Sequence, residues 1–147
     1  MAPLTKILLP LALAGFATAA IVPVTGQALV TKDDDQPPFM TGLQSGQGTF
    51  FDAELGACGF INDNSEHIAA VSNLLFDAVP GYDGDSFHNP VCGRQVTAYY
   101  KDRSTTVTIT DSCADCDITN LDFTPTAFAD LEPDLDVGRI DITWEWV

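Results

Sequence analysis

The clearest pattern in the chain is the alternation of apolar and polar residues over its last ten positions, GRIDITWEWV. Every second residue there is apolar: Ile140, Ile142, Trp144 and Trp146. This period of two predicts a β-strand with one buried face, and both tryptophans continue the isoleucine stripe into the core. Residues 94–100 (RQVTAYY) and 105–111 (TTVTITD) are β-branched and aromatic runs joined by KDRS, which predicts a β-hairpin. In its second strand, Val107 and Ile109 are expected on one face.

Two further segments carry apolar residues at other spacings. Residues 67–76 (HIAAVSNLLF) fit either a helical stripe or a buried strand, and the pattern alone leaves both open. Residues 124–131 (TPTAFADL) predict a short helix, with Thr124 as its cap, Pro125 in the first turn, and Phe128 and Leu131 facing inward. Residues 79–93 are rich in Pro, Gly, Asp and Asn and predict a loop. Short strands, glycine-rich turns and one small helix together indicate a compact β-barrel.

The N-terminal region has the pattern of an export signal. Lys6 precedes an apolar run from Ile7 to Ala20, and Ala17-Thr18-Ala19 offers small residues for cleavage. The run is too short for a membrane anchor, so residues 1–19 are expected to be a signal peptide and the protein to be secreted into the extracellular space. Residues 20–46 show no period and are expected to be a flexible arm or a pro-segment. Residues 47–147 then form the single folded domain.

The acidic composition restricts the partners. With 21 acidic and 6 basic residues the net charge is -15. Such a chain repels nucleic acid and anionic membrane surfaces, so partners are expected to be neutral or basic. The charge has a simpler explanation as well, namely solubility. A monomer is the default expectation.

The four cysteines all follow the predicted signal peptide. An even number in an oxidising compartment predicts two disulfides, and three pairings are possible. The simplest is a local Cys113–Cys116 clip with a longer Cys58–Cys92 tie. A redox role for the CADC segment would require a helix N-terminus, and a zinc site would require two more ligands at similar spacing. His67 and His88 are isolated, so we expect no metal and no cofactor.

Several segments together resemble a known fold family. GTFFDAELGACGF (48–60), the CGRQVTAYY and VTITDSC strands, LDFTPTAFADL (121–131) and the terminal strand resemble the double-psi β-barrel of expansins, single-domain fungal loosenins, barwin-like and RlpA-like proteins. The resemblance implies a mainly β fold: a six-stranded double-psi barrel with one or two short helices and an open groove. The family is related to inverting glycoside hydrolases, whose acid and base positions correspond here to Asp122 and Asp52. Asp111, in the TD pair that expansins carry, would lie in the same groove.

The sequence departs from the hydrolases in ways that favour a protein without lytic activity. Asn120-Leu121 replaces the His-Phe pair before the acid, and neither the longer hydrolase loops nor a second carbohydrate-binding domain is recognisable. The leading hypothesis is therefore an expansin-like protein that binds cell-wall polysaccharide (β-glucan, cellulose or chitin) and loosens it without hydrolysis, using Asp122 and Asp111. A second hypothesis is a protein-binding scaffold, such as a cysteine-protease inhibitor or an effector that binds a host protein. The third is an endoglucanase with Asp122 as acid and Asp52 as base.

The residues of this groove have structural explanations too. Asp111 could cap a strand end and Asp122 the following helix, since aspartate suits both roles. Five aromatic residues are candidates for a sugar-stacking platform, of which at most two are expected to be exposed: Phe51, Tyr82, Tyr99, Tyr100 and Phe123.

Overall fold

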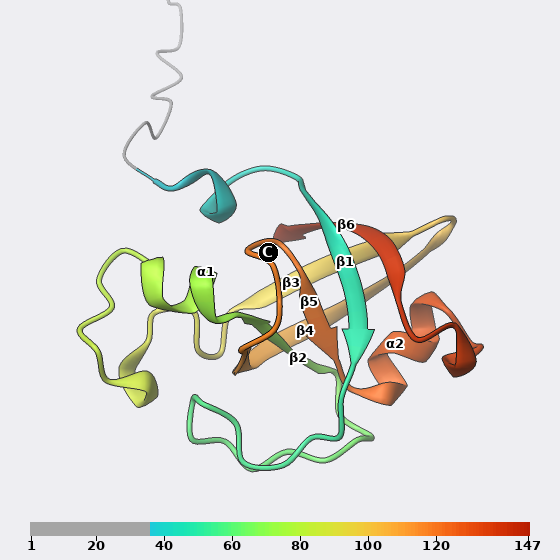
Figure 1. The fold of residues 1–147 in the computed structure, drawn as a ribbon, viewed down its shortest axis with the longest axis horizontal. Coiled ribbons are helices and arrows are strands. Elements are labelled where there is room, and N and C mark those ends of the chain that lie inside the picture. The colour runs from blue at the N-terminus through green and yellow to red at the C-terminus, as the bar shows by residue number, and fades with distance from the viewer. Residues whose placement is uncertain (1–35) are drawn as a thin grey trace, which may run out of the picture. The chain divides into compact units, whose positions relative to one another are not determined.

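Six strands close into a barrel in the computed structural model, which describes residues 36–147 (Figure 1). The strands are β1 (Gln44–Phe50), β2 (Ile68–Ser72), β3 (Gln95–Tyr100), β4 (Arg103–Cys113), β5 (Leu121–Phe123) and β6 (Ile140–Trp146). Around the barrel they follow the order β1-β5-β2-β4-β3-β6. The pairs β1–β5 and β2–β4 are parallel and the other four are antiparallel. The mainly β class and the six-stranded barrel predicted from the sequence are confirmed.

The predicted hairpin and terminal strand are present with the expected faces. β3 pairs with β4 through a tight turn in which Lys101 has a φ of 54°. In β6 the indole of Trp144 is fully buried, as the alternation predicts. Trp146, nearer the end of the strand, packs against the edge of the core and donates its indole N–H to the Phe39 carbonyl. Its ring is covered by the Arg94 guanidinium, 4.3 Å from the ring centroid.

The sequence left open whether residues 67–76 form a helix or a buried strand, and the structure contains both in succession. These residues form β2, which is buried along its whole length, and then the helix α1 (Asn73–Ala78). The change occurs at Ser72, whose hydroxyl accepts a hydrogen bond from the Leu74 amide and caps α1. Because all five residues of β2 are buried, the strand shows no alternation of apolar and polar residues in the sequence.

The second helix is correctly predicted, and Thr124 occupies its N-cap position, although not as a side-chain cap. α2 spans Pro125–Leu131, with Pro125 in the first turn and Phe128 and Leu131 buried. The Thr124 side chain makes no capping hydrogen bond. Its hydroxyl instead donates to the Glu66 carbonyl at 2.5 Å, so it fixes the chain before β2 to the chain after β5. In the predicted loop 79–93, residues Ser86–His88 form a 3-10 turn. A further 3-10 turn, Leu135–Val137, precedes β6.

The N-terminal side of the barrel begins before position 47. A 3-10 turn at Pro38–Met40 places Met40 against the core, and β1 starts at Gln44, inside the range expected to be an arm. The predicted signal peptide (1–19) and residues 20–35 of the expected arm lie outside the described residues. Within residues 36–147, no helix has the length and apolar character needed to cross a bilayer.

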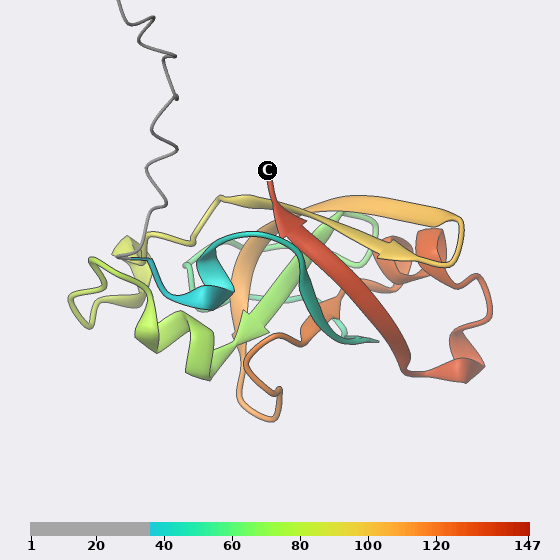
Figure 2. The ribbon, with the colours of Figure 1, turned by 90° about the horizontal axis from the view of Figure 1, so that it is seen from above.

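Figures 1 and 2 show α1 and α2 at opposite ends of the barrel.

Candidate functional site

Four residues form a row across the outer face of the barrel. The strand pairing aligns Thr49 of β1 with Asp122 of β5, Asp122 with Ala70 of β2, and Ala70 with Asp111 of β4. Residues paired directly across neighbouring strands point to the same face of a sheet. The row Thr49–Asp122–Ala70–Asp111 therefore lies on one surface, with the small Ala70 side chain between the two carboxyl groups.

A β-bulge places Asp111 in this row. The register between β2 and β4 shifts after Ala69, which pairs with Ile109, so that Ala70 pairs with Asp111 and Thr110 is the extra residue. Strict alternation from Ile109 would have turned Asp111 toward the core, whereas the bulge turns it outward. Thr110 is buried as a result, and its hydroxyl has no hydrogen-bond partner among the described residues.

Asp122 is half-buried and has a perturbed acidity. Burial raises the pKa of its carboxyl group above the ordinary value, and the negative charge of Asp111 adds to this. A hydrogen bond donated by the Thr49 hydroxyl to Oδ1, 2.5 Å long, and the positive charge of Arg139 act in the opposite direction on the pKa. The net direction is upward, so Asp122 retains its proton to a higher pH than a solvent-exposed aspartate does.

Asp122 lines a small polar cavity of about 340 Å³. The lining residues are Thr49, Phe50, Cys113, Ala114, Asp115, Cys116, Asn120, Asp122 and Arg139. The Asn120 side-chain oxygen accepts a hydrogen bond from the backbone amide of Gln47. The Arg139 guanidinium donates to the side-chain oxygen of Gln47 at 2.9 Å. Hydroxyl, amide, carboxyl and guanidinium groups thus surround one space, which suits a ligand rich in hydroxyl groups.

The Cys113–Cys116 disulfide forms one wall of this cavity, and it confirms the predicted local clip. The loop is also fixed to the barrel, because the Ser72 hydroxyl donates to the Cys116 carbonyl at 2.7 Å. A disulfide here holds the loop beside Asp122 in one conformation. None of the described residues forms a group of three or more His, Cys, Asp or Glu side chains that could hold a metal ion.

Asp111 lines a different and more apolar cavity of about 600 Å³. One of its oxygens, Oδ1, accepts hydrogen bonds from the backbone amides of Ala57 (2.7 Å) and Ser112 (2.8 Å). The lining residues are Leu55, Gly56, Ala57, Gly84, Asp85, Ser86, Phe87 and Asp111. Two strand spacings, about 10 Å, separate Asp111 from Asp122 along the row. The two carboxyl groups that the resemblance placed in one groove therefore border two cavities.

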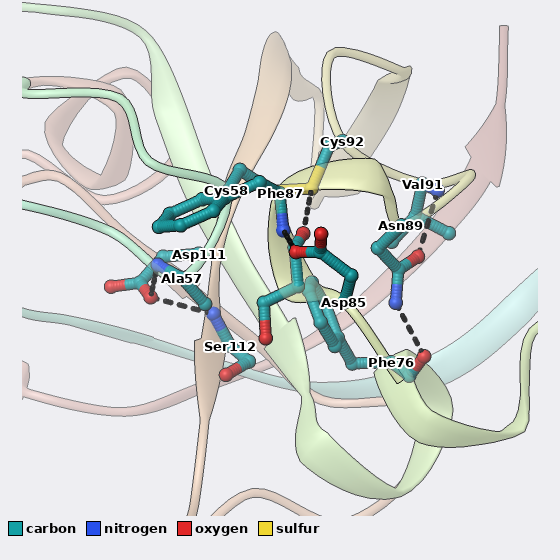
Figure 3. Close-up of a disulfide and its surroundings, with 11 residues drawn as sticks. Ala57, Cys58, Phe76, Asp85, Phe87, Asn89, Val91, Cys92, Asp111 and Ser112 are labelled. Atoms are coloured by element: carbon teal, nitrogen blue, oxygen red, sulfur yellow. Dashed lines mark hydrogen bonds between the residues drawn. A yellow bond between two sulfur atoms is a disulfide. The ribbon is translucent and has the colours of Figure 1, made fainter. Parts of the chain in front are cut away.

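The second disulfide, Cys58–Cys92, confirms the predicted long tie. It connects the loop that follows β1 to the loop that follows α1, with 5.6 Å between the two Cα atoms. Figure 3 shows Asp111, Phe87 and Asp85 around this disulfide. The covalent tie thus holds both walls of the Asp111 cavity.

Asp52, the expected base, lies in the exposed loop after β1. Its side chain accepts a hydrogen bond from the Asn64 amide at 2.8 Å. It is not among the residues that line the Asp122 cavity. Its role as a catalytic base therefore stays a prediction.

The five candidate stacking residues lie in different places. Phe123 is fully buried because it faces inward from β5, so the prediction that it stacks on a sugar is wrong. Tyr82 packs edge-on against Phe76 with 5.7 Å between the ring centroids, and Phe51 is half-buried. Tyr99 and Tyr100 line a third open cavity of about 550 Å³, together with Lys101 and residues of β1 and β6. Among the described residues, the one aromatic ring that lines the Asp122 cavity is that of Phe50, which the sequence did not single out.

A group of exposed apolar side chains was also missed. Their exposed fractions are large: Leu55 67%, Phe60 46%, Ile61 84% and Phe87 66%. We call these four residues the apolar rim. Leu55 and Ile61 pair in an isolated β-bridge, and the Phe87 ring packs on the backbone of Gly59. The available sequence signal was a run of apolar residues near Cys58 without the period of a strand or helix.

Comparison with known proteins identifies relatives by sequence. No family model matches the chain. It is 40% identical over 81 residues to an allergen Asp f 7 homologue of Arthroderma benhamiae, a match covering 54% of this chain and only 26% of that protein. It is 31% identical over 135 residues to the papain inhibitor of Streptomyces mobaraensis, covering 89% of this chain and 90% of the inhibitor.

Solved structures support the same conclusion. The Streptomyces papain inhibitor superposes with a TM-score of 0.65 at 31% identity, over 74% of this chain and 96% of the inhibitor. An expansin from Clavibacter michiganensis superposes with a TM-score of 0.57 at 23% identity, over 72% of this chain and 50% of the expansin. A mutant of that expansin has been solved in complex with cellohexaose. The chain is therefore a double-psi β-barrel protein. Within this fold it belongs to the family of the Streptomyces papain inhibitor.

Proposed function

We propose that this protein is a secreted protein-binding domain that inhibits a papain-like cysteine protease. The observation that carries the proposal is the relationship to the papain inhibitor, which extends over nearly the full length of both chains. A shared barrel alone would not support a shared function, because one fold serves many activities. The argument therefore rests on the extent of the match and on the surface described next.

The apolar rim has the properties of a protein-binding surface. Four large apolar side chains are exposed on two loops; Leu55 pairs with Ile61 and lines one cavity with Phe87, where isolated exposed residues would be unremarkable. The Cys58–Cys92 disulfide and the Leu55–Ile61 bridge hold these loops in place before any partner binds. Preorganised loops lose little conformational entropy on association, which strengthens binding.

Titration of papain with the purified protein tests the proposal. We expect inhibition by the wild type, weakened by Leu55→Ala and by Phe87→Ala, since truncating a side chain at the centre of an interface can cost more than about 1 kcal/mol. Leu43→Ala is a matched control, because Leu43 is 62% exposed and precedes β1, whereas Leu55 follows it. Absence of inhibition at micromolar protein, or equal losses in the Leu43 and Leu55 variants, would refute the proposal.

The Asp122 cavity favours a second candidate function, the binding of cell-wall polysaccharide without hydrolysis. Its polar lining offers donors and acceptors for sugar hydroxyl groups, and Asp122 carries a raised pKa. Inverting hydrolysis would require a base about 6.5–9.5 Å from the acid, and Asp52 does not line the cavity. The two functions use separate surfaces, so they can be tested separately.

A pull-down on insoluble cellulose and chitin, with released reducing sugar measured in the same tubes, tests this candidate. Binding without release, weakened in Asp122→Asn, is the expected result. Release that Asp122→Asn abolishes would instead indicate an endoglucanase. If neither binding nor release occurs, the candidate fails.

Export is proposed from the N-terminal pattern, and sequencing of the secreted protein should find Ala20 as its first residue.

A further inference from the structure

The cavity beside Asp111 combines apolar walls with negative charge. Leu55 and Phe87, both about two-thirds exposed, stand on its two sides. Asp111 and Asp85 contribute carboxyl groups to the same lining. No lysine or arginine is among the described residues that line the cavity. Such a space would bind an apolar stem and would also favour a positive charge.

Both carboxyl groups are fixed by the backbone. Oδ1 of Asp111 accepts two amide hydrogen bonds, and Figure 3 shows its second oxygen pointing away from both donors. Oδ1 of Asp85 accepts from the Phe87 amide at 3.0 Å, and Oδ2 lies 3.0 Å from Nδ1 of the exposed His88. Groups held in this way need little reorganisation when a cation arrives, so their attraction to it is not offset by lost side-chain entropy.

We propose that this cavity binds an arginine side chain of the partner protein, which rests on the proposed protein-binding function. The arginine stem would lie between Leu55 and Phe87, and its guanidinium group would reach the free oxygen of Asp111. A planar guanidinium stacks on aromatic rings and hydrogen-bonds carboxylates, which a compact ammonium group does less well. The molecule contains an internal example, since Arg94 lies over the Trp146 ring.

The overall charge and the neighbouring surface support the same class of partner. The chain carries a net charge of -15, so a basic patch on a partner would be attracted over a long range. Phe60 and Ile61 extend the apolar rim beyond the cavity. The complementary surface is therefore an arginine flanked by apolar residues on a protein. Neutral polysaccharides such as cellulose and β-glucan offer neither a positive charge nor a comparable apolar stem.

Titration of the labelled protein with acetyl-Leu-Arg-Leu-amide, followed through its amide NMR signals, tests this inference. We expect shifts at Gly56, Ala57 and Phe87, and none with acetyl-Leu-Gln-Leu-amide at the same concentration. The substitutions Asp111→Asn and Asp85→Asn keep an oxygen that can accept the existing backbone hydrogen bonds and remove the charge. Together they should weaken peptide binding at least about tenfold, because hydrogen bonds to charged groups are among the strong ones.

Asp102→Asn is the matched control, since it removes the same charge in the exposed β3–β4 turn and should leave peptide binding unchanged. Urea unfolding of each variant identifies any loss that comes from misfolding. Shifts at the cavity without papain inhibition would retain this inference and refute the proposed function. Papain inhibition without peptide shifts, and unaffected by the double substitution, would overturn the inference and retain the proposed function. Equal weakening by Asp102→Asn would also overturn it.

Discussion

Removing the Cys58–Cys92 disulfide should destabilise the protein more than removing Cys113–Cys116. A disulfide restricts the unfolded chain, and the effect grows with the number of residues in the closed loop. The two bonds join residues separated by 34 and by 3 positions along the chain. In the chain-entropy model the loss is roughly 4 kcal/mol for the longer loop and roughly 2 kcal/mol for the shorter one. Losing the longer bond would therefore remove a large fraction of the 5–15 kcal/mol typical of domains.

Urea unfolding of the wild type and of the two double cysteine-to-alanine variants measures this difference at one pH and temperature. The expected order of stability is wild type, then the variant lacking Cys113–Cys116, then the variant lacking Cys58–Cys92. The slope of the unfolding transition must be compared as well, because a changed slope indicates a changed unfolded state. If the variant lacking Cys58–Cys92 is as stable as the other, the loop-entropy reasoning is wrong for this chain.

The same variants separate the two candidate surfaces. Cys58–Cys92 ties the loops that carry the apolar rim, whereas Cys113–Cys116 forms a wall of the Asp122 cavity. Under conditions where both variants remain folded, loss of the first bond should weaken papain inhibition. Loss of the second should affect only polysaccharide binding. A variant lacking Cys58–Cys92 that is folded and fully inhibitory would show that the rim does not depend on this tie.

Three further predictions concern single residues. Burial raises the folded-state pKa of Asp122, so its protonated form favours folding, and that contribution to stability is lost as pH rises above about 4. In thermal melts, Asp122→Asn should therefore gain stability relative to the wild type as pH rises. A stability difference that stays constant with pH would contradict the assigned pKa direction. Gly46→Ala would bring a Cβ into collision with the Thr119 carbonyl oxygen, so urea unfolding should show a loss of roughly 2 kcal/mol or more, and a neutral effect would mean that the loop moves freely. Thr124→Val should lose about 1–3 kcal/mol in the same assay by leaving the Glu66 carbonyl unpaired, while a neutral result would show that water replaces the hydroxyl.

The sequence predicted the elements that bury a single face. β6 and the β3–β4 hairpin alternate because one side of each strand faces the core, so their patterns could be read directly. β2 could not be assigned in this way, since all five of its residues are buried. β5 also alternates, although over only three residues. Leu121 and Phe123 share the inner face, and this places the ring of Phe123 in the core and Asp122 outside.

The site was harder to predict because it depends on one irregularity. Nothing in the TTVTITD segment identifies Thr110 as the extra residue of a bulge, yet the bulge decides that Asp111 points outward. Resemblance placed Asp111 and Asp122 in one groove, and the strand pairing aligns them on one face of the barrel. It did not indicate that they line separate cavities, which depends on the loops around residues 55–61 and 84–87.

The arrangement of the row explains how one barrel could carry two recognition surfaces. Thr49, Asp122, Ala70 and Asp111 are held by neighbouring strands, so their spacing is set by the rigid part of the fold. What surrounds each carboxyl group is set by loops: a disulfide-closed polar loop at Asp122, and an apolar, disulfide-tied pair of loops at Asp111. Loops tolerate change far more readily than barrel strands do. Relatives with this row can therefore differ in whether they recognise sugars or proteins, and the loop residues beside each aspartate are the ones to compare.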